Sequence, residues 1–498
     1  MSARVLMIQG TGSDVGKSVV VAGLCRLATQ RGWRVAPFKP QNMSNNAAAC
    51  AAGGEIGRAQ ALQARAAGLE PHPDFNPVLL KPQTDRGTQI VVHGKPVGLL
   101  NAADYTTGRA HLMTAVMESF QRLVAAHDLV LVEGAGSPAE VNLRTGDIAN
   151  MGFALAAGVP VCLVGDIDRG GVIAALVGTQ SVLDPEDSAL IAGFLVNKFR
   201  GDPVLFTEGV AVIERRTGWP CFGVVPWMPA ATRLPAEDAV SLSLGHGERT
   251  DCIRIAAPLL SRLANFDDAD PLRFEPDVDF TFVPPGRPIP RDVDVVILFG
   301  TKSTNGDLDF LRAQGWDHDV IAHARAGGRV LGVCGGFQML GRHIHDPAGA
   351  DGPVGSRPGL DLLELETTMA GEKTVRPARG HCTLSGASVT GYEIHTGQSG
   401  GRALTRPMFQ LKTGPDGARS QDGLIEGTYL HGLFGNDAYR RAWLGRIRDT
   451  GAATLQYEAS VEAALDDVAA TLADSMDTDA LFSTARRPGL AKPAAQMP

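Results

Sequence analysis

The sequence lacks three features that would assign it to a large class of proteins. Its 498 residues contain no CxxC pair, no Cys/His cluster with the spacing of a metal site, and no run of about 18 apolar residues. It also lacks a basic surplus, since 46 lysine and arginine residues face 54 aspartate and glutamate residues, for a formal net charge of -8. We therefore expect no membrane partner, and no nucleic-acid partner, which would usually need a basic face.

The cysteines are scattered and odd in number, which is the usual pattern of a reduced cytosolic protein. The N-terminus shows no basic segment followed by a long apolar stretch, so we expect a cytoplasmic protein. We expect most of the thiols to be inert core residues, with Cys334 as the exception. The seven are Cys25, Cys50, Cys162, Cys221, Cys252, Cys334 and Cys382.

The chain is too long for a single hydrophobic core, and its strand-like runs fall into two groups. Over residues 1–226 apolar runs alternate with helical segments, which predicts a doubly wound α/β domain with a parallel sheet. Residues 227–250 are rich in proline, glycine and charge, which is typical of a linker. A second α/β alternation over 251–442 predicts another such domain, and 443–498 is left for C-terminal helices and a tail. We expect one or two helices after about Asn436 and fraying from about Thr484.

The runs expected to be strands end in polar or glycine-rich segments. In the first domain they are RVLMIQ, RVAPFKP, DLVLVEG, VPVCLVGD, LIAGFLVNK and CFGVVP. In the second they are CIRIAAP, FTFV, DVVILFG, RVLGVCG, LDLLELE, GYEIH and GLIEGTYLHG.

A glycine-rich loop, GTGSDVGKS, follows the first of these runs and is suited to holding phosphates. Five residues separate Gly10 from Gly16, where the strict GxxxxGK[ST] pattern has four. Small residues after a strand still let backbone N–H groups surround a phosphate, so we predict an ATP site, with a turn that binds nothing as the alternative. Lys17 would neutralise the outer phosphates, and Ser18 would hold Mg²⁺. The predicted ATP-binding residues are Gly10, Thr11, Gly12, Ser13, Asp14, Val15, Gly16, Lys17 and Ser18.

Polar side chains follow other strands of the same predicted sheet. Glu133 ends the run LVLVE, where its carboxylate could be the second Mg²⁺ contact or could cap the next helix. Lys39, Gln41 and Asn42 follow the second strand, at the edge where open α/β sheets bind ligands. They suit a carboxylate substrate and a transferring phosphoryl group, but a plain polar turn fits their composition equally well.

Cys334 lies in RVLGVCGGFQMLG, where a strand-like run ends in a glycine-flanked turn and a helical pattern resumes. A helix N-terminus favours negative charge, so a thiol placed there becomes a nucleophilic thiolate more easily. The N–H of Gly335 could stabilise an oxyanion, with a second donor from Gly300 or Thr301 in LFGTKST. His431, in GTYLHGLFG, is a credible base, and a strand-end histidine without a catalytic role is the alternative.

These motifs resemble those of a known enzyme family. GVCGGFQ matches the G-x-C-x-G-x-Q nucleophile turn of class I, or triad, glutamine amidotransferases, and the N-terminal half is similar to ATPases of the dethiobiotin synthetase type. Their fusion in this order is typical of the cobyrinic acid and cobyric acid amidases of cobalamin biosynthesis, and it implies a flavodoxin-like second domain. Over most of residues 1–440, the motifs that resemble the cobyric acid synthase branch are FKPQNMSNN, EIGRAQALQA, NPVLLKP, EGAGSPAEVNL, GDIANM, DIDRGGV, GTKST, GYEIH and YLHGLF.

The resemblance implies an ATP- and glutamine-dependent amidoligase, with Mg²⁺ as cofactor and corrinoid, glutamine and ATP as small-molecule partners. Adenosylcobyrinic acid a,c-diamide would be amidated on its b, d, e and g carboxylates through acyl phosphates. Cys334 would attack glutamine with His431 as acid and base. Asp147, in GDIANM, would face the corrinoid, although capping a helix is an equal alternative. A homo-oligomer is an option that the sequence does not decide.

Two positions depart from the family pattern. Phe299 stands where the GTKST loop usually has a proline, and Leu433 stands where ordinary triad amidotransferases have a carboxylate two residues after the histidine. The acid that orients His431 must then come from elsewhere, and Glu393 of GYEIH is one candidate.

Two other functions fit parts of the sequence. Cobyrinic acid a,c-diamide synthase, the sister amidase, uses the same chemistry on an earlier substrate, but FKPQNMSNN and DIDRGGV argue against it. A ParA- or MinD-like nucleotide-switched binding ATPase has the same type of loop, but it would carry an extra early lysine where this chain has Thr11 and Gly12. Such a switch would also have no use for Cys334.

Overall fold

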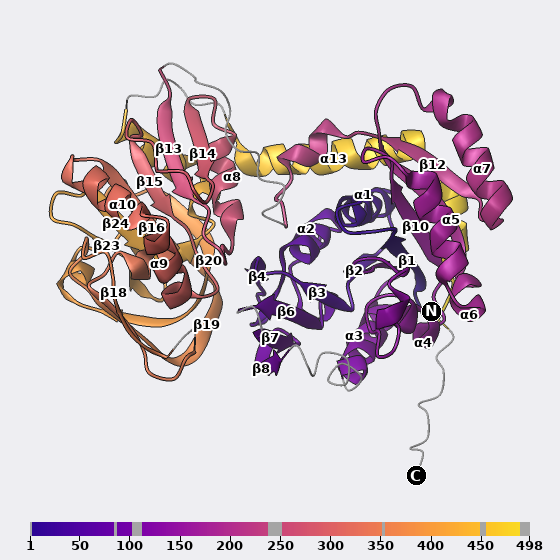
Figure 1. The fold of residues 1–498 in the computed structure, drawn as a ribbon, viewed down its shortest axis with the longest axis horizontal. Helices are drawn as coiled ribbons and strands as arrows, with labels where there is room; N and C mark the ends of the chain where they lie inside the picture. Colours follow the sequence, from indigo (N-terminus) through magenta and orange to yellow (C-terminus); the bar gives the residue numbers. More distant parts are fainter. Residues whose placement is uncertain are drawn as a thin grey trace, which may run out of the picture.

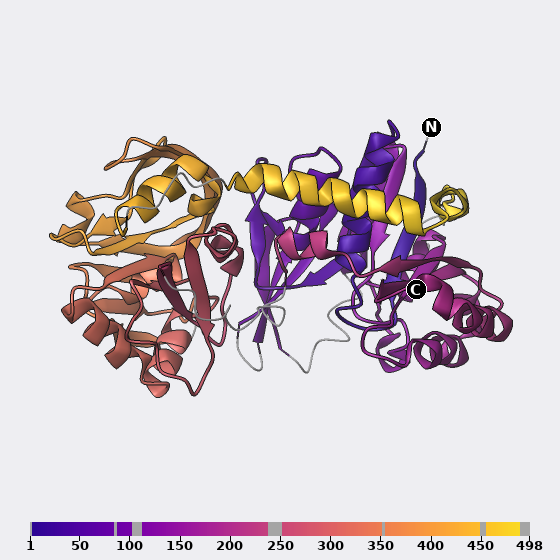
Figure 2. The ribbon, with the colours of Figure 1, turned by 90° about the horizontal axis from the view of Figure 1, so that it is seen from above.

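The computed structural model describes residues 2–83, 87–101, 112–237, 251–350, 354–448 and 455–488, and it shows two α/β lobes side by side (Figure 1). The first lobe holds the predicted phosphate loop, and the second holds Cys334. A long helix, α13 (Tyr457–Ser475), leaves the second lobe and runs back along the first (Figure 2). Within the described ranges, no helix is long and apolar enough to cross a membrane.

A six-stranded parallel sheet forms the centre of the first lobe, in the order β12-β11-β10-β1-β9-β2. Its strands are β1 (Arg4–Gly10), β2 (Val35–Phe38), β9 (Leu129–Glu133), β10 (Val161–Asp166), β11 (Ile191–Phe199) and β12 (Cys221–Pro226). All six match runs expected from the sequence. Because β1 pairs with both β9 and β10, the loops after these strands meet at one edge of the sheet.

Helices cover both faces of this sheet, which explains why its strands are apolar throughout. Val5 and Met7 of β1 face one core, and Leu6 and Ile8 face the other. The first core is covered by α3 (Leu112–Ala126), α4 (Met151–Ala157), α5 (Val172–Val182) and α7 (Thr207–Thr217). The second is covered by α1 (Lys17–Gln30), α13 and α14 (Thr478–Thr484).

Smaller strands lie on the side of the first lobe that faces the second (Figure 1). One sheet has the order β3-β6-β7-β8, and a further pair joins β4 to β5. Helix α2 (Arg58–Ala66) begins directly after β5. The strands are β3 (Gln41–Met43), β4 (Ala47–Ala49), β5 (Glu55–Gly57), β6 (Val78–Pro82), β7 (Gly87–Val92) and β8 (Lys95–Asn101).

The second lobe is built on a sheet of order β14-β13-β15-β16-β24-β23, parallel except for β23. Its strands are β13 (Ile253–Pro258), β14 (Val278–Val283), β15 (Val295–Leu298), β16 (Arg329–Val333), β23 (Ala418–Arg419) and β24 (Ile425–Thr428). Its helices are α8 (Asp270–Arg273), α9 (Thr304–Ala313), α10 (Trp316–Arg325), α11 (Gly335–Met339) and α12 (Asp437–Gly445).

A second, mainly antiparallel sheet in this lobe was not expected from the sequence. Its order is β18-β17-β19-β20-β25, and the pairing of β20 with β25 places Tyr392 opposite His431. The run GLIEGTYLHG is therefore split, with one part in each sheet. The strands of this path are β17 (His343–Asp346), β18 (Gly355–Pro358), β19 (Glu366–Cys382), β20 (Ser388–Gly400) and β25 (Leu430–His431). Two more strands belong to the sheet, since β21 (Phe409–Leu411) pairs with β19 and β22 (Gly414–Asp416) pairs with β21.

One predicted strand is wrong. LDLLELE, residues 360–366, is irregular up to Leu365, and β19 begins only at Glu366. Leu360, Leu363 and Leu365 are all buried in the core of the second lobe. The run is apolar because it packs as a covering loop, which composition alone does not distinguish from a strand.

Among the described residues after Asn436 there are three helices, where one or two were expected. Trp443 and Leu444 of α12 belong to the core of the second lobe, whereas α13 and α14 complete a core of the first. A Cβ on Gly23 of α1 would lie 2.7 Å from Val468 of α13, so these two helices pack closely. Of the predicted linker, Pro229–Arg233 forms a 3₁₀ turn, and residues 238–250 lie outside the described ranges, as do residues 489–498 of the tail.

The two lobes contact each other through both apolar and polar groups. Ala47, Leu79 and Val91 of the first lobe cluster with Ile394 of the second. The N–H of Ala47 donates to Oδ1 of Asn265 at 2.9 Å. The lobes therefore share a packed interface, which lies beside β4 and β20.

Candidate functional site

The predicted phosphate loop connects β1 to α1, as the sequence suggested. Gly16 has a φ of 97°, and a Cβ there would lie 2.3 Å from Nδ2 of Asn197, so only glycine fits. Nζ of Lys17 donates to the carbonyl oxygens of Gly12 at 2.9 Å and Gly136 at 3.0 Å. Burial lowers the pKa of Lys17 to about 8, although Glu133 opposes this shift. The ammonium group of Lys17 is thus held between the phosphate loop and the loop after β9, where it could bind a phosphate.

Glu133 ends β9 and lies at the centre of a buried polar cluster. Its Oε1 accepts hydrogen bonds from Oγ of Ser18 and Nζ of Lys39, both at 2.8 Å, and its Oε2 accepts one from Gln63 at 2.5 Å. Burial raises the pKa of Glu133, but Lys39 and these hydrogen bonds outweigh burial and lower it overall. The side chain is therefore a carboxylate, and its bonds go to this cluster and not to a helix N-terminus.

Ser18 and Glu133 offer oxygen donors of the kind that Mg²⁺ prefers. Mg²⁺ usually keeps several waters and phosphate oxygens, so two protein ligands beside a nucleotide are enough. Their oxygens already lie 2.8 Å apart, next to Lys17. The residues present therefore fit Mg²⁺ bound together with ATP. Within the described residues, no group of three or more His, Cys, Asp or Glu side chains forms a metal site without a nucleotide.

A cavity of about 740 Å³ opens over this cluster. Asn42 donates to Gln60 at 2.9 Å and to Oε1 of Glu237 at 2.5 Å, so its side chain is held at the cavity wall. The structure thus brings the polar residues after β2 to the predicted phosphate site. The predicted substrate residues Lys39, Gln41, Asn42 and Asp147 all line this cavity.

Asp147 makes the helix-capping contacts that the sequence offered as one of its two possible roles. Its Oδ1 accepts from the N–H of Ala149 at 2.8 Å, and its Oδ2 accepts from the N–H of Gly152 at 2.8 Å, so the carboxylate holds the start of α4. The same residue lines the cavity. Contact of Asp147 with a corrinoid stays a prediction.

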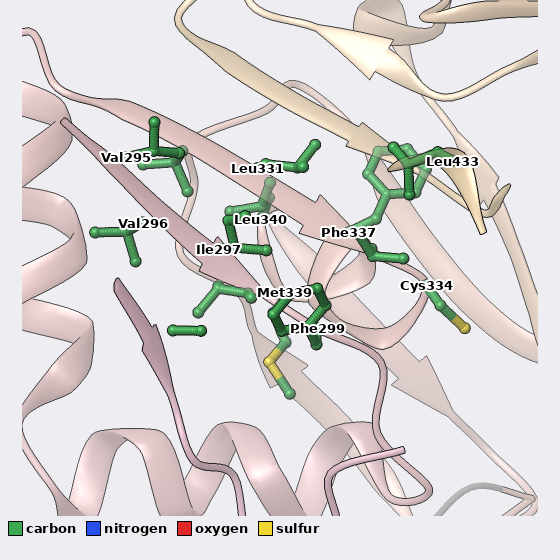
Figure 3. Packing of buried hydrophobic residues seen from close by; sticks show 14 of the residues in the cluster. Val295, Val296, Ile297, Phe299, Leu331, Cys334, Phe337, Met339, Leu340 and Leu433 are labelled. Atoms are coloured by element: carbon green, nitrogen blue, oxygen red, sulfur yellow. The ribbon is translucent and has the colours of Figure 1, made fainter. Parts of the chain in front are cut away.

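Cys334 follows β16 with φ 52° and ψ -109°, a conformation that is strained for a residue with a side chain. A Cβ on Gly336 would lie 1.9 Å from the carbonyl oxygen of Leu298, so the turn needs its glycines. The sulfur points away from the labelled apolar side chains of the core (Figure 3). The following helix, α11, has only five residues, so its dipole is weaker than the sequence pattern suggested.

His431 lies beside the thiol. A Cβ on Gly300 would lie 3.2 Å from Cε1 of His431 and 3.6 Å from Cβ of Cys334, so the imidazole and the thiol face the same small space. Nε2 of His431 is buried and makes no hydrogen bond of ordinary geometry to the described residues. Sγ of Cys334 lies 3.3 Å from the carbonyl oxygen of Ile394. The imidazole therefore has one nitrogen available to the thiol or to a substrate.

Asp268 orients this histidine. Its Oδ2 lies 2.7 Å from Nδ1 of His431, and its Oδ1 accepts from the N–H of Gly432 at 2.6 Å. Burial lowers the pKa of His431, but Asp268 and Cys334 outweigh it and raise the pKa to about 10. The charged imidazolium is therefore the favoured form at neutral pH.

The prediction that Glu393 supplies this acid is wrong. Oε2 of Glu393 is bound by Nε of Arg376 at 2.6 Å, and Nδ1 of His431 is bound by Asp268. Leu433, at the usual position of the acid, is buried in the core. A signal for Asp268 was present in the acidic run FDDAD, which follows β13 at the carboxyl edge of the sheet.

The predicted oxyanion donors lie next to each other. A Cβ on Gly335 would lie 3.1 Å from the backbone N of Thr301, so the Gly300–Thr301 loop runs beside the nucleophile turn. Gly335 begins α11, and its N–H has no acceptor within the helix. Phe299, the residue that replaces proline, is buried, with its ring 6.3 Å from that of Phe282. Gly300 and Gly335 remain the predicted donors.

Residues of both lobes line the pocket at Cys334, which has a volume of about 50 Å³. Asn45 and Lys81 come from the first lobe. Lys81 forms a buried ion pair with Glu55 at 2.8 Å, and burial lowers the pKa of this lysine to about 8. The thiol site therefore lies at the interface between the lobes.

Sequence reasoning also missed the residues that hold Glu133. Gln60 and Gln63 lie three residues apart on α2, and both direct their amides at the Glu133 carboxylate. The signal was the pair of glutamines in EIGRAQALQA, because residues at this spacing share one helix face. Glu237, which binds Asn42, had no signal in the sequence.

Two family models match the two lobes and together cover most of the chain. Residues 6–242 match the CobQ/CobB/MinD/ParA nucleotide binding domain, and residues 254–439 match the CobB/CobQ-like glutamine amidotransferase domain. The first match contains the phosphate loop and Glu133, and the second contains Cys334, His431 and Asp268.

Curated relatives match over nearly their full length. The chain is 65% identical to "Cobyric acid synthase" of Hyphomonas neptunium, covering 98% of this chain and 99% of that protein. It is 61% identical to the protein of that name in Paracoccus denitrificans, covering 97% and 99%, and 57% identical to that of Bradyrhizobium diazoefficiens, covering 97% and 100%. The chain therefore belongs to the cobyric acid synthase family of glutamine-dependent amidoligases of cobalamin biosynthesis.

Proposed function

We propose that the chain converts adenosylcobyrinic acid a,c-diamide to adenosylcobyric acid by amidating its b, d, e and g carboxylates, with one ATP and one glutamine for each. The observation that carries this proposal is the pairing of a Cys334–His431–Asp268 group with a Lys17–Ser18–Glu133 cluster in a single chain. The names of its relatives do not favour the earlier substrate, cobyrinic acid.

In the first lobe, ATP would activate a corrinoid carboxylate. A carboxylate resists attack by ammonia because its charge and resonance make the carbon a poor electrophile. Transfer of the γ-phosphoryl group to its oxygen breaks the bond to ADP and creates a good leaving group. Lys17, and Lys39 once released from Glu133, would stabilise charge on the transferring phosphoryl group. Mg²⁺ held by Ser18 and Glu133 would supply further charge neutralisation.

In the second lobe, glutamine would supply the nitrogen. The Cys334 thiolate attacks the side-chain amide carbon, and Gly300 and Gly335 would stabilise the oxyanion. His431 then gives its proton to the departing ammonia, which leaves a thioester on Cys334. The neutral imidazole next removes a proton from water, and the resulting attack releases glutamate and restores the thiolate. Asp268 keeps the ring oriented throughout.

The ammonia would then displace phosphate from the acyl phosphate in the first lobe. Free ammonia is mostly protonated at neutral pH and is then not a nucleophile, so release beside the interface avoids this loss. The cavity of about 740 Å³ is large and open, which suits a macrocycle that must present four different carboxylates. The seven cysteines are free thiols, which supports a reducing compartment such as the cytoplasm.

The substrate can be tested by incubating the purified protein with ATP, glutamine and either cobyrinic acid or its a,c-diamide. Mass spectrometry of the products counts the amide groups added to each. We expect four additions to the a,c-diamide. Addition of two amides to cobyrinic acid, with no further change to the a,c-diamide, would contradict the proposal and favour the sister enzyme.

A further inference from the structure

The short segment that carries Asp268 is held in place by the other lobe. Asp268 lies in a 3₁₀ turn, Phe266–Ala269, that directly follows Asn265. Asn265 has a left-handed backbone, with φ 54°, and its N–H donates to Oδ1 of Asn46 at 2.6 Å. Its Oδ1 in turn accepts from the N–H of Ala47 at 2.9 Å. The start of the turn is therefore fixed by β4 and the loop before it.

Arg58 holds the same turn from a second direction. This residue is the first of α2 in the first lobe, and its Nε lies 3.1 Å from Oδ2 of Asp267, the neighbour of Asp268. Its guanidinium also donates to the carbonyl oxygen of Ala47 at 3.1 Å and to the hydroxyl of Tyr392. The side chains of Arg58 and Asp267 are only 14% and 12% exposed, so the ion pair is mostly shielded from water.

Two of the three partners of Arg58 lie next to the catalytic imidazole or next to the residue that holds it. The ring of Tyr392 stacks on the ring of His431, with centroids 5.1 Å apart and an interplanar angle of 13°. Asp267 precedes Asp268, which holds Nδ1 of His431. Arg58 therefore holds two neighbours of the imidazole. Tyr392 covers one face of the ring, and Asp267 is bonded to Asp268, the acid that orients the ring. Arg58 is not among the residues that line either pocket, so substrate contact does not explain its position.

The same helix reaches the phosphate site. Gln63, five residues after Arg58, donates to Oε2 of Glu133 at 2.5 Å, and Gln60 donates to the same atom at 3.4 Å. Helix α2 thus contacts Glu133, the group expected to hold Mg²⁺, through its third and sixth residues, and it contacts the turn that carries Asp268 through its first residue, Arg58. The five-residue rise from Arg58 to Gln63 spans only about 7.5 Å within one helix, so a displacement of Gln63 together with Glu133 would be expected to displace Arg58 as well.

We propose that Arg58 is a positioning residue for glutamine hydrolysis, and that α2 makes this hydrolysis depend on the state of the ATP site. This inference rests on the proposed function of the two sites. Without Arg58, Asp267 would be a mostly buried carboxylate beside Asp268 with no cation of its own, and the turn would shift. A shift of about 1 Å at His431 is enough to slow the reaction about 100-fold.

The test compares Arg58→Met and Arg58→Lys with Arg65→Met in the full-length protein. Arg65 is a matched control because it is also an arginine of α2 with two ion pairs, to Glu458 at 2.6 Å and Glu462 at 2.7 Å, but these go to α13 within the first lobe. Glutamate release is measured with and without ATP and corrinoid, and amidation is measured separately with added ammonium chloride.

Arg58→Met should lower kcat for glutamine hydrolysis about 100-fold, change its KM for glutamine little, and reduce the stimulation by ATP and corrinoid. Arg58→Lys should recover part of the rate, and Arg65→Met should behave as the wild type. Wild-type hydrolysis and stimulation in Arg58→Met would overturn the inference, as would an equal loss of ammonia-dependent amidation, which would indicate general damage. Failure of the proposed function is distinct, because the wild type would then amidate no corrinoid with either nitrogen source.

Discussion

Replacing Asp268 with asparagine should weaken His431 as a proton donor. Asparagine has nearly the same size as aspartate, so the packing around His431 is retained. The carboxylate lies 2.7 Å from Nδ1 of His431 and accepts from Gly432 at 2.6 Å. Asparagine keeps the shape and the bond to Gly432, but it offers no charge to the imidazolium. A hydrogen bond to a charged group contributes about 1.5–3 kcal/mol, and a buried charge without its partner costs about 3–5 kcal/mol.

The sign of the pH effect is set by these contacts. Asp268 raises the pKa of His431, so its loss must lower that pKa from its present value of about 10. A loss of about 3 kcal/mol corresponds to roughly two pKa units. His431 would then lose its proton at a lower pH, and above that pH it could not protonate the departing ammonia. The ring would still be mostly protonated at pH 7, so we attribute an expected fall in kcat of about 10- to 100-fold there to loss of its orientation, and we expect the alkaline limb of the pH profile to move to lower pH.

The assay is glutamate release across pH, with Glu393→Gln as the matched control. Glu393 is also a buried carboxylate of the same lobe, but it binds Arg376, so its loss should leave the profile in place. Ammonia-dependent amidation should survive in both variants. An Asp268→Asn protein with the wild-type rate and the wild-type alkaline limb would refute the assignment of Asp268.

Three further changes probe the two sites. Cys334→Ala should abolish amidation with glutamine and retain it with ammonia at high pH, as measured by product mass; loss with both nitrogen sources would show that the lobes do not work separately. Glu133→Gln should slow amidation about 100-fold with either nitrogen source, because Ser18, Lys39 and the metal lose their common partner; an effect confined to glutamine would contradict this. Gly16→Ala should raise the KM for ATP and lower the Tm, because a φ of 97° costs about 1–3 kcal/mol and its Cβ would lie 2.3 Å from Asn197. Gly32→Ala is its control, since Gly32 has a φ of 82° but open space around it.

Features that depend on local pattern could be predicted from the sequence. Apolar runs such as that of β1 identify parallel strands, and the loop to Lys17 and the turn at Cys334 are marked by glycines that the backbone requires. The carboxyl edge of the sheet then explains why Glu133, Lys39 and Asn42 come together.

The remainder depends on contacts between distant segments, which no local pattern reveals. Asp268 and His431 are 163 residues apart and meet only because the turn Phe266–Ala269 packs against the turn that follows β25. The strand predicted at LDLLELE failed because Leu360 and Leu363 cover a core as a loop. Arg58 could not be placed either, since its role arises from packing between the two lobes.

Nitrogen released at Cys334 should be fixed in the first lobe of the same protein. The most direct test supplies glutamine labelled with ¹⁵N in its side-chain amide, together with an excess of unlabelled ammonium chloride near neutral pH, and measures the label in the amidated corrinoid. We expect the product to keep nearly all of the label. Dilution of the label to the ratio in bulk solution would contradict it.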